Sequence, residues 1–298
     1  MKKRRQRFNE PAWVGFVLLL LLFHHTLDAS QTQIFSGPVS MAMGGGGRAG
    51  IEATEKFFLN PAAVAFGEGF ELGMSFRDGY WANGEHESGF NIAMLENDPE
   101  NFAKGGFAYV QRRRTAPGLT WDEQYIYGAI GQNVSEFFSF GISVYHLSQK
   151  VKDAPDHTAV NGSLGALFTL NPAVGFAYVF TNPVAADKDV PVALRPIPQQ
   201  SIALNVLFQQ LMRITLDVTR YEKQNPDKKG IIQIGNEIKL TEYGVFRLGF
   251  EVDDIQKRNA FTAGIGFLGP RLRANYAFVK PFVETNGAMH SVDLRLPF

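Results

Sequence analysis

His146 and Ser148 are the two side chains whose spacing comes nearest to a catalytic pair. They lie two residues apart on one predicted strand, and Asn161 follows on the next predicted strand, across a loop. A histidine base beside a hydroxyl, with an amide to hold the imidazole, is an arrangement that can perform nucleophilic hydrolysis. Hydrolysis is therefore one hypothesis. The alternative is that His146 is a polar side chain at an interface, because one His-x-Ser is easily met by chance.

No other reactive cluster stands out in the sequence. The chain has no Cys, which excludes disulfides and thiolate metal sites, and its six His are scattered. The run Gly44 to Gly47 is not a phosphate loop, because no strand precedes it and no Lys-Ser/Thr follows. Basic and acidic side chains number 29 each, which argues against a nucleic-acid partner. We expect no catalytic residue, no metal and no cofactor.

Three consecutive arginines, Arg112 to Arg114, end a predicted strand next to a predicted outer loop, Arg112 to Leu119. Guanidinium groups hold phosphates through charge-assisted hydrogen bonds, so the run could bind lipopolysaccharide. The alternative is the solvated edge of a loop.

The elements that carry these side chains are predicted to be strands. From Glu68 onward, apolar and polar residues alternate, as in Met212 to Thr219 and Phe246 to Asp253. Fourteen segments have this pattern, and short turns alternate with longer polar or Pro-rich connections along almost the whole chain. That rhythm favours a membrane barrel with short periplasmic turns over a soluble β-sandwich. We predict an all-β fold, a closed antiparallel transmembrane barrel over residues 67–298.

Parity assigns the two surfaces of the predicted barrel. The apolar set faces lipid, and the polar set faces the lumen. Both charge signs are present in the lumen set, which favours pairing across the lumen over a charge-selective pore. The predicted lumen-facing charges are Arg213, Asp217, Glu237, Lys239, Arg247, Glu251, Arg271, Arg273, Asp293 and Arg295.

Both ends of the chain carry signals that fit export and barrel assembly. A basic start, the apolar run Trp13 to Phe23 and small residues near Ala29 predict a signal peptide over residues 1–29, cleaved after Ala29. A membrane anchor is the alternative, although the run is shorter than the roughly 20 residues that span a bilayer. The chain stops on Phe298, on the apolar face of an alternating strand. This end resembles the signal by which the barrel-assembly machinery recognises its substrates.

Residues 30–66 do not alternate and precede the first strand. They include the run Gly44 to Gly47 and the turn-forming pair Asn60-Pro61. A backbone of this kind cannot face lipid, because its polar groups would be unpaired. We therefore expect the segment to fold into the lumen as a plug.

This segment resembles the N-terminal hatch of FadL-type outer-membrane transporters and is similar to their PorV-like relatives, which are associated with type IX secretion. Glu52 and Glu55 stand where that family tends to have Asp, and Ala63 stands where Gly is usual. A second Asn-Pro-Ala, Asn171 to Ala173, is interpreted as turn chemistry only. The matching residues, which the resemblance implies are hatch or gating residues, are Met43, Gly44, Gly45, Phe57, Phe58, Asn60, Pro61 and Ala62.

The resemblance implies a fourteen-stranded barrel in the cell outer membrane and passive uptake of a hydrophobic small molecule such as a fatty acid or hydrocarbon. An interrupted strand at Gly105-Gly106, Gly128 or Gly131 could supply a side exit. The first alternative is a PorV-like scaffold that binds an envelope protein through the Pro-rich loop Thr181 to Gln199. An outer-membrane lipid hydrolase is the second alternative. Outer-membrane lipid, lipopolysaccharide and the assembly machinery are the expected partners.

Overall fold

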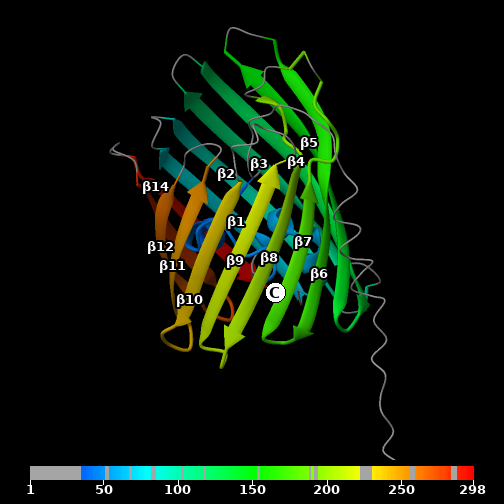
Figure 1. The fold of residues 1–298 in the computed structure, drawn as a ribbon, viewed down its shortest axis with the longest axis vertical. Helices are drawn as coiled ribbons and strands as arrows, with labels where there is room; N and C mark the ends of the chain where they lie inside the picture. Colours follow the sequence, from blue (N-terminus) through cyan, green and yellow to red (C-terminus); the bar gives the residue numbers. More distant parts are fainter. Residues whose placement is uncertain are drawn as a thin grey trace, which may run out of the picture.

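The computed structural model describes residues 35–50, 54–66, 69–81, 85–98, 100–101, 104–116, 119–152, 155–187, 189–190, 194–221, 230–254, 259–282 and 287–298. Over these residues, fourteen antiparallel strands close into a barrel in which each strand pairs with its neighbours in sequence and β1 pairs with β14 (Figure 1). The predicted barrel and its strand number are confirmed. The predicted signal peptide and its cleavage site lie outside the described residues.

The strand bounds show that the wall is tall on one side. Strands β4, β5 and β6 have 17, 14 and 15 residues, whereas β10, β12, β13 and β14 have nine each. A tilted strand crosses a bilayer with about 9–11 residues, so the tall side extends beyond that need. The strands are β1 (Gly69–Tyr80), β2 (His86–Asn97), β3 (Lys104–Ala116), β4 (Leu119–Ser135), β5 (Phe138–Val151), β6 (His157–Asn171), β7 (Val174–Thr181), β8 (Gln199–Phe208), β9 (Met212–Tyr221), β10 (Ile231–Lys239), β11 (Gly244–Asp253), β12 (Ala260–Leu268), β13 (Arg273–Pro281) and β14 (Met289–Pro297).

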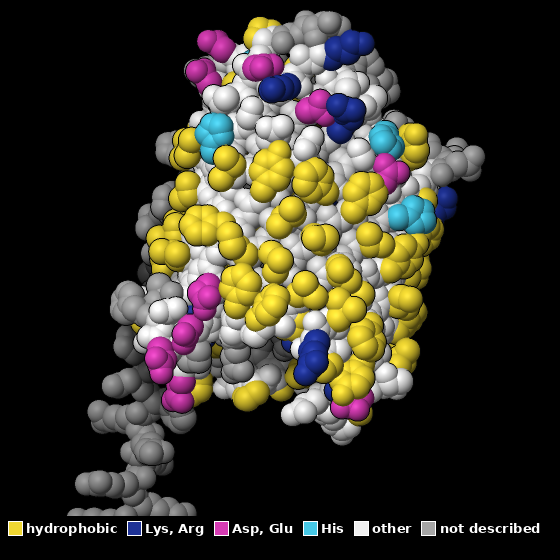
Figure 2. Space-filling view, turned by 180° about the vertical axis from the view of Figure 1, so that it is seen from behind, with side chains coloured by type: hydrophobic (Ala, Val, Ile, Leu, Met, Phe, Trp, Pro, Cys, Tyr) yellow, Lys and Arg dark blue, Asp and Glu magenta, His cyan; other side chains and the backbone are white. Residues whose placement is uncertain are grey.

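Alternation along the strands separates an apolar outward surface from a polar lumen. In β9, Ile214, Leu216 and Val218 are exposed, whereas Arg213 and Asp217 are buried. The outward residues pair with outward residues of the next strand, because antiparallel register preserves the face. Figure 2 shows the result on one side of the molecule as a wide field of hydrophobic side chains, with charged groups and His towards its upper border.

One predicted connection is wrong. The segment Arg112 to Leu119 was expected to be a long outer loop, but β3 runs to Ala116 and β4 begins at Leu119. The two strands stay paired to their ends, so Arg112, Arg113 and Arg114 lie within the wall and not on a loop edge. The sequence did not predict a strand here, because three consecutive arginines occupy both lumenal and outward positions and therefore show no alternation of polar and apolar residues.

Residues 35–50 and 54–66, hereafter the N-terminal segment, lie inside the barrel (Figure 1, blue). The segment contains two short helices, α2 (Pro38–Ala42) and α3 (Lys56–Leu59), and the 3₁₀ helix η1 (Pro61–Phe66). Contacts run from α2 to β11–β14 and from η1 to β2–β6, so the segment touches opposite sides of the wall. Within the described residues, no helix has the length and apolar character needed to cross a bilayer.

The connection between β7 and β8 folds inward over the loop end of the barrel. Leu194 and Ile197 are almost fully buried: Leu194 packs with Trp121 and Val151, and Ile197 packs with Tyr221 and Ile231. The Asn182 side chain donates a hydrogen bond to the carbonyl of Ile197 at 2.9 Å and accepts one from the Tyr145 hydroxyl at 2.6 Å. The described part of this loop therefore covers the lumen through Leu194 and Ile197, whereas Val184 near its start is exposed.

Candidate functional site

The candidate site is the contact between the N-terminal segment and the lumenal face of the wall. Its polar anchor is Asp217 on β9, which is fully buried. The Asp217 carboxylate accepts hydrogen bonds from the backbone N–H groups of Gly47 and Arg48 and from the Arg48 guanidinium, at 2.9 to 3.1 Å. Arg48 also donates to Gln233 at 3.0 Å, and Gln233 donates to Glu251 at 3.0 Å. A buried carboxylate is thereby satisfied by both charge and hydrogen bonds.

The glycine run lets the backbone reach this wall. Gly44 and Gly45 have backbone φ angles of 69° and 80°, in a region that residues with a Cβ rarely adopt. A Cβ on Gly44 would lie 2.4 Å from the carbonyl oxygen of Phe250, and a Cβ on Gly249 would lie 2.2 Å from the Gly44 nitrogen. Gly44 also donates its N–H to the Thr262 hydroxyl at 2.9 Å. Close approach of backbone to backbone therefore requires Gly on both sides.

Glu55 fixes helix α2 from within the segment. Its carboxylate accepts the N–H groups of Val39 at 2.7 Å and Ser40 at 2.8 Å, which are free donors at the start of a helix. Burial raises the pKa of Glu55, the neighbouring Asp293 carboxylate raises it further, and the hydrogen bonds from Ser40 and Val39 oppose the shift. Glu55 and Glu52 stand where the FadL-type family tends to have Asp. Glu55 stabilises the segment by binding the start of α2, and Glu52 lies outside the described residues.

The Asn60-Pro61-Ala62 motif sits against a row of glycines on the tall side of the wall. The Asn60 amide donates to the carbonyl of Arg48 at 2.9 Å, and its oxygen accepts the N–H of Ala62 at 3.0 Å. The second motif makes the same turn, with Ala173 N–H bound to the Asn171 oxygen at 2.8 Å. The two motifs make the same local turn and differ in their surroundings, because only the first faces a row of glycines.

That row consists of Gly131, Gly141 and Gly165, which are direct cross-strand partners on β4, β5 and β6. A Cβ on each would lie 2.7, 2.3 and 2.1 Å, respectively, from atoms of residues 60–62. The missing side chains therefore form the recess that holds the motif. Gly131, considered above as a source of strand interruption, belongs to this recess.

Phe57 and Phe58 form the apolar half of the contact. Both rings pack on Tyr127, with centroids 4.9 and 5.2 Å away, and Phe58 also packs on Phe35 at 5.4 Å. Tyr127 stacks on Tyr145 at 6.0 Å. Leu95, Val110, Leu147 and small side chains of β2–β5 complete this buried cluster. Hence the lumenal face of β2–β5 is apolar where it meets the segment.

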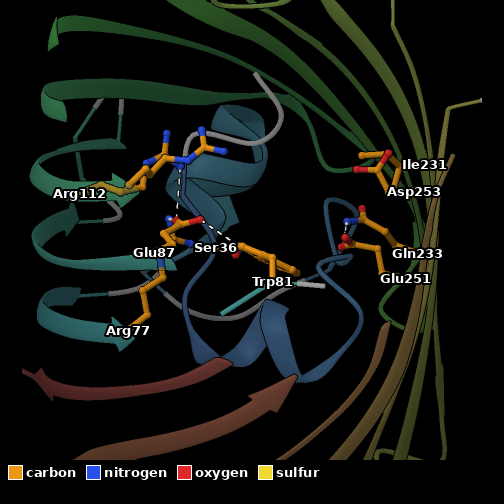
Figure 3. A pocket seen from close by; sticks show the side chains of 10 residues that line it. Ser36, Arg77, Trp81, Glu87, Arg112, Ile231, Gln233, Glu251 and Asp253 are labelled. Atoms are coloured by element: carbon orange, nitrogen blue, oxygen red, sulfur yellow. Dashed lines mark hydrogen bonds and ion pairs between the residues drawn. The ribbon is translucent and has the colours of Figure 1, made fainter. Parts of the chain in front are cut away.

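Between the N-terminal segment and the loop end, the lumen is polar and nearly filled. Figure 3 shows Arg77, Glu87 and Arg112 on one side of a small cavity and Gln233, Glu251 and Asp253 on the other, with Trp81 between them. The cavity has a volume of about 60 Å³, against a share of roughly 30 Å³ per molecule in liquid water. It accommodates waters and not a hydrocarbon.

The arginine run contributes to this polar layer. Arg112 pairs with Glu123, its Nε lying 2.6 Å from the carboxylate, and Arg114 pairs with Glu85 at 2.7 Å. Arg113 points outward and pairs with Asp122 at 2.7 Å. The expectation of a solvated loop edge is therefore corrected. Two of the three guanidinium groups are lumenal, and sequence reasoning missed them because a loop had been assigned there.

The predicted lumenal charges mostly form a chain of pairs along the wall. Arg247 binds Glu237 at 2.7 Å and Asn275 at 2.8 Å, and Asn275 in turn binds Asp293 at 2.8 Å. The pairs Arg213–Glu237, Arg295–Asp293 and Arg273–Glu71 continue the chain at 3.7, 3.3 and 3.1 Å. The partners lie on the same strand (Arg295–Asp293), on adjacent strands (Arg213–Glu237) or two strands apart (Arg273–Glu71), because residues close together on one face of the wall are nearer than residues across the lumen.

Arg271 and Lys239 are exceptions among the predicted lumenal charges, because both are exposed. β12 ends at Leu268 and β13 begins at Arg273, so Arg271 lies exposed in the turn between them. Lys239 ends β10 and is also exposed. Alternation between the two faces applies only within a strand. Arg271 lies in the turn between β12 and β13, so it does not face the lumen.

The hydrolase arrangement is not assembled. His146 is exposed on the outward face of β5 with Val160 as its cross-strand partner, whereas Asn161 is buried on the lumenal face opposite Tyr145. The Asn161 amide donates to the carbonyl of Val184 at 2.7 Å. Because neighbouring residues on a strand point to opposite faces, Asn161 cannot hold the imidazole of His146.

Over the described residues, the β2–β3 and β3–β4 ladders show no interruption, whereas the β4–β5 ladder shifts register between Asn133 and Ser135. Pairing is continuous from Glu96–Gly105 to His86–Thr115 and from Lys104–Gly131 to Ala116–Leu119. Gly105 and Gly128 instead line a hollow of about 610 Å³ on the outward surface, rimmed by Phe107 and other apolar side chains. The predicted glycine positions thus thin the wall without opening it.

The fold is shared with solved hydrocarbon channels. The Ralstonia pickettii toluene transporter TbuX superposes with a TM-score of 0.66 at 14% identity, covering 88% of this chain and 98% of that one. The CymD monoaromatic hydrocarbon channel gives 0.69 at 13%, covering 90% and 99%, and a Pseudomonas aeruginosa FadL homologue gives 0.66 at 12%, covering 90% and 100%. No family model and no curated protein matches the chain. The predicted resemblance to FadL-type barrels is confirmed for the fold.

Proposed function

We propose that this chain is an outer-membrane barrel that admits a hydrophobic small molecule by passive diffusion, with the N-terminal segment as a movable plug. An apolar outward face on a closed barrel suits lipid, since a closed ladder leaves no backbone group unpaired there. The fold shared with a toluene transporter and a monoaromatic hydrocarbon channel supports the same class of solute. Residues 1–29 would direct export.

The observation that carries the proposal is the aromatic contact of Phe57 and Phe58 with Tyr127. A general porin has a polar, water-filled lumen. Here the segment covers an apolar patch of the lumen, which Leu95, Val110 and Leu147 extend. Movement of the two Phe rings would expose a lining suited to an apolar solute, because such a solute regains the contacts that the rings give up.

The segment is held in a way that allows movement. Its contact to β9–β12 combines the Asp217 ion pair and hydrogen bonds with close backbone approach at Gly44. Its contact to β2–β6 combines aromatic packing and close backbone approach with hydrogen bonds to the carbonyls of Phe57 and Ala62. A solute that competes for the aromatic cluster would weaken the second contact while the first retains the segment. The plug would therefore shift without leaving the barrel.

Uptake of radiolabelled toluene and palmitate by a deletion strain tests the proposal. The wild-type gene should restore uptake of at least one solute, and Tyr127→Ala should change the rate because Tyr127 lines the aromatic cluster. Ile126→Ala, the next residue on β4 and outward-facing, is the matched control and should behave as wild type. Unaltered uptake in the deletion strain across fatty acids and aromatic hydrocarbons would contradict the proposal.

One observation favours the scaffold alternative. The polar cavity above the segment is only about 60 Å³, and the β7–β8 loop covers the loop end. A barrel closed in this way could serve as a partner-binding surface. Affinity purification in mild detergent distinguishes the two functions, since a scaffold should retain an envelope protein at near-stoichiometric amounts and leave solute uptake unchanged on deletion.

A further inference from the structure

The described ends of the β7–β8 loop and the N-terminal segment meet the same buried row of side chains from opposite directions. Asn182 follows the last residue of β7 and has a φ of 58°, in the left-handed region that Asn tolerates better than most residues. Its amide donates to the carbonyl of Ile197 at 2.9 Å, so it joins the start of the loop to its end. Its oxygen accepts the Tyr145 hydroxyl at 2.6 Å. The loop is therefore bonded to the lumenal face of β5.

From Tyr145 the row continues to the N-terminal segment through aromatic rings. The Tyr145 ring lies nearly parallel to that of Tyr127, with an interplanar angle of 7° and centroids 6.0 Å apart. The Tyr127 ring packs on Phe57 and Phe58, and its hydroxyl donates to the Phe57 carbonyl at 3.3 Å. A displaced Tyr ring would leave a buried polar group without a partner, which costs free energy. The two hydroxyls therefore hold the row at both ends.

The surroundings of the row leave its members little room to move independently. Tyr125 packs edge-on against Tyr145 with ring centroids 5.5 Å apart, and Leu147 and Val64 belong to the same buried cluster. Close-packed interiors change between discrete arrangements and do not deform continuously. A shift of Asn182 must therefore be taken up by Tyr145 and passed to its neighbours.

We infer that seating of the β7–β8 loop and docking of the N-terminal segment are energetically coupled through Asn182, Tyr145 and Tyr127. The inference rests on the proposed function, because it requires a plug that moves. A solute that lifts the loop weakens the contact of Phe57 with the wall. Undocking of the segment weakens the seat of Ile197 by the same factor, because coupling between two sites is reciprocal. The two ends of the lumen therefore open together.

Hydrogen exchange of the full-length barrel in lipid nanodiscs tests the coupling. The amides of Phe58 and Asn60, both bonded within the segment, report on the plug, and the Asn182 amide, bonded to β6, reports on the loop. Ile197→Ala removes a buried loop side chain and should speed exchange at the plug amides about fivefold or more. Phe57→Ala should speed exchange at Asn182 by a similar factor.

Tyr145→Phe removes only the hydroxyl that joins the wall to the loop. In that background, neither substitution should affect the far end. Tyr125→Phe is the matched control, because it removes a hydroxyl of the same cluster that bonds Arg112 and Glu123 on the wall, and it should leave both effects intact. Retention of heat-modifiable migration on a gel shows that each variant is a folded barrel. Effects that persist in Tyr145→Phe, or plug amides that do not respond to Ile197→Ala, would overturn the inference.

Uptake of toluene and palmitate by cells is measured separately and tests the proposed function. Uptake without coupled exchange would leave the proposed function standing and overturn only the coupling. Coupled exchange without uptake of either solute would support a loop and a segment that move together, and it would contradict the proposed transport.

Discussion

Arg48 and Asp217 lie 169 positions apart in sequence, yet their side chains meet at 2.9 Å inside the barrel, and both are buried. The same carboxylate also binds two backbone N–H groups of the segment. This single aspartate therefore joins the N-terminal segment to the middle of the wall. Removal of the Asp217 carboxylate should therefore loosen the N-terminal segment while the barrel stays folded.

Asp217→Ala is expected to loosen the segment without unfolding the barrel. Breaking a buried ion pair on one side costs roughly 3–5 kcal/mol, because the remaining charge is uncompensated. Trypsin cleavage after Arg48 and Lys56, which are both buried in the wild type, should therefore accelerate about a hundredfold or more. Asp122→Asn removes the outward partner of Arg113 and should leave cleavage unchanged. Equal rates in wild type and Asp217→Ala would refute the anchor.

Gly131→Ala should weaken docking of the Asn-Pro-Ala motif. The added Cβ lies 2.7 Å from the carbonyl oxygen of Pro61, so the segment must shift, at a cost of about 1–3 kcal/mol for overpacking. Gly128→Ala is the matched control on the same strand, since its nearest neighbour is the Phe107 ring at 3.6 Å. We expect higher single-channel conductance in planar bilayers only for Gly131→Ala. An identical trace for both variants would contradict the recess.

Docking of the segment should also depend on pH through Glu55. Burial raises the pKa of Glu55 above its ordinary value of 4.5, so protonation is favoured in the docked state. The stability gained is fully present below 4.5 and is lost as pH rises through the docked pKa. Hydrogen-exchange protection of the Val39 and Ser40 amides, corrected for intrinsic rates, should fall across that window. Glu55→Gln should show no such decline; a slope equal to the wild type would exclude Glu55 as the cause.

Phe298 is expected to matter for assembly more than for the finished fold. It is 76% exposed, and it contacts the wall through Phe70, with ring centroids 5.7 Å apart and its N–H bonded to the Phe70 carbonyl at 2.8 Å. Phe298→Ser should reduce the amount of heat-modifiable barrel in outer-membrane fractions several-fold. Phe208→Ser, which changes another exposed aromatic at the same end, is the control. Comparable yields from the two variants would remove the predicted role.

Alternation of polar and apolar residues predicts the faces of β9 but not those of the strand that contains Arg112 to Arg114. Alternation in Met212 to Tyr221 assigned both faces correctly, because a strand with one lipid side and one polar side must repeat every two residues. Alternation did not reveal the strand at Arg112 to Arg114, because its lumenal and outward positions are both charged. Their pairing with Glu123, Glu85 and Asp122 depends on strands whose register only the folded wall defines.

The alternating pattern of residues was sufficient to predict the closed barrel, its strand number, its two surfaces and the non-alternating segment ahead of it. These follow from periodicity and from the need of a membrane-spanning backbone to pair all of its polar groups. The folded structure was needed to show that Gly131, Gly141 and Gly165 align into a recess, and that Asp217 binds Arg48. It also placed Asn161 on the face opposite His146. Such contacts join residues far apart in the chain, and they are fixed by cross-strand register and closure, which no local spacing encodes.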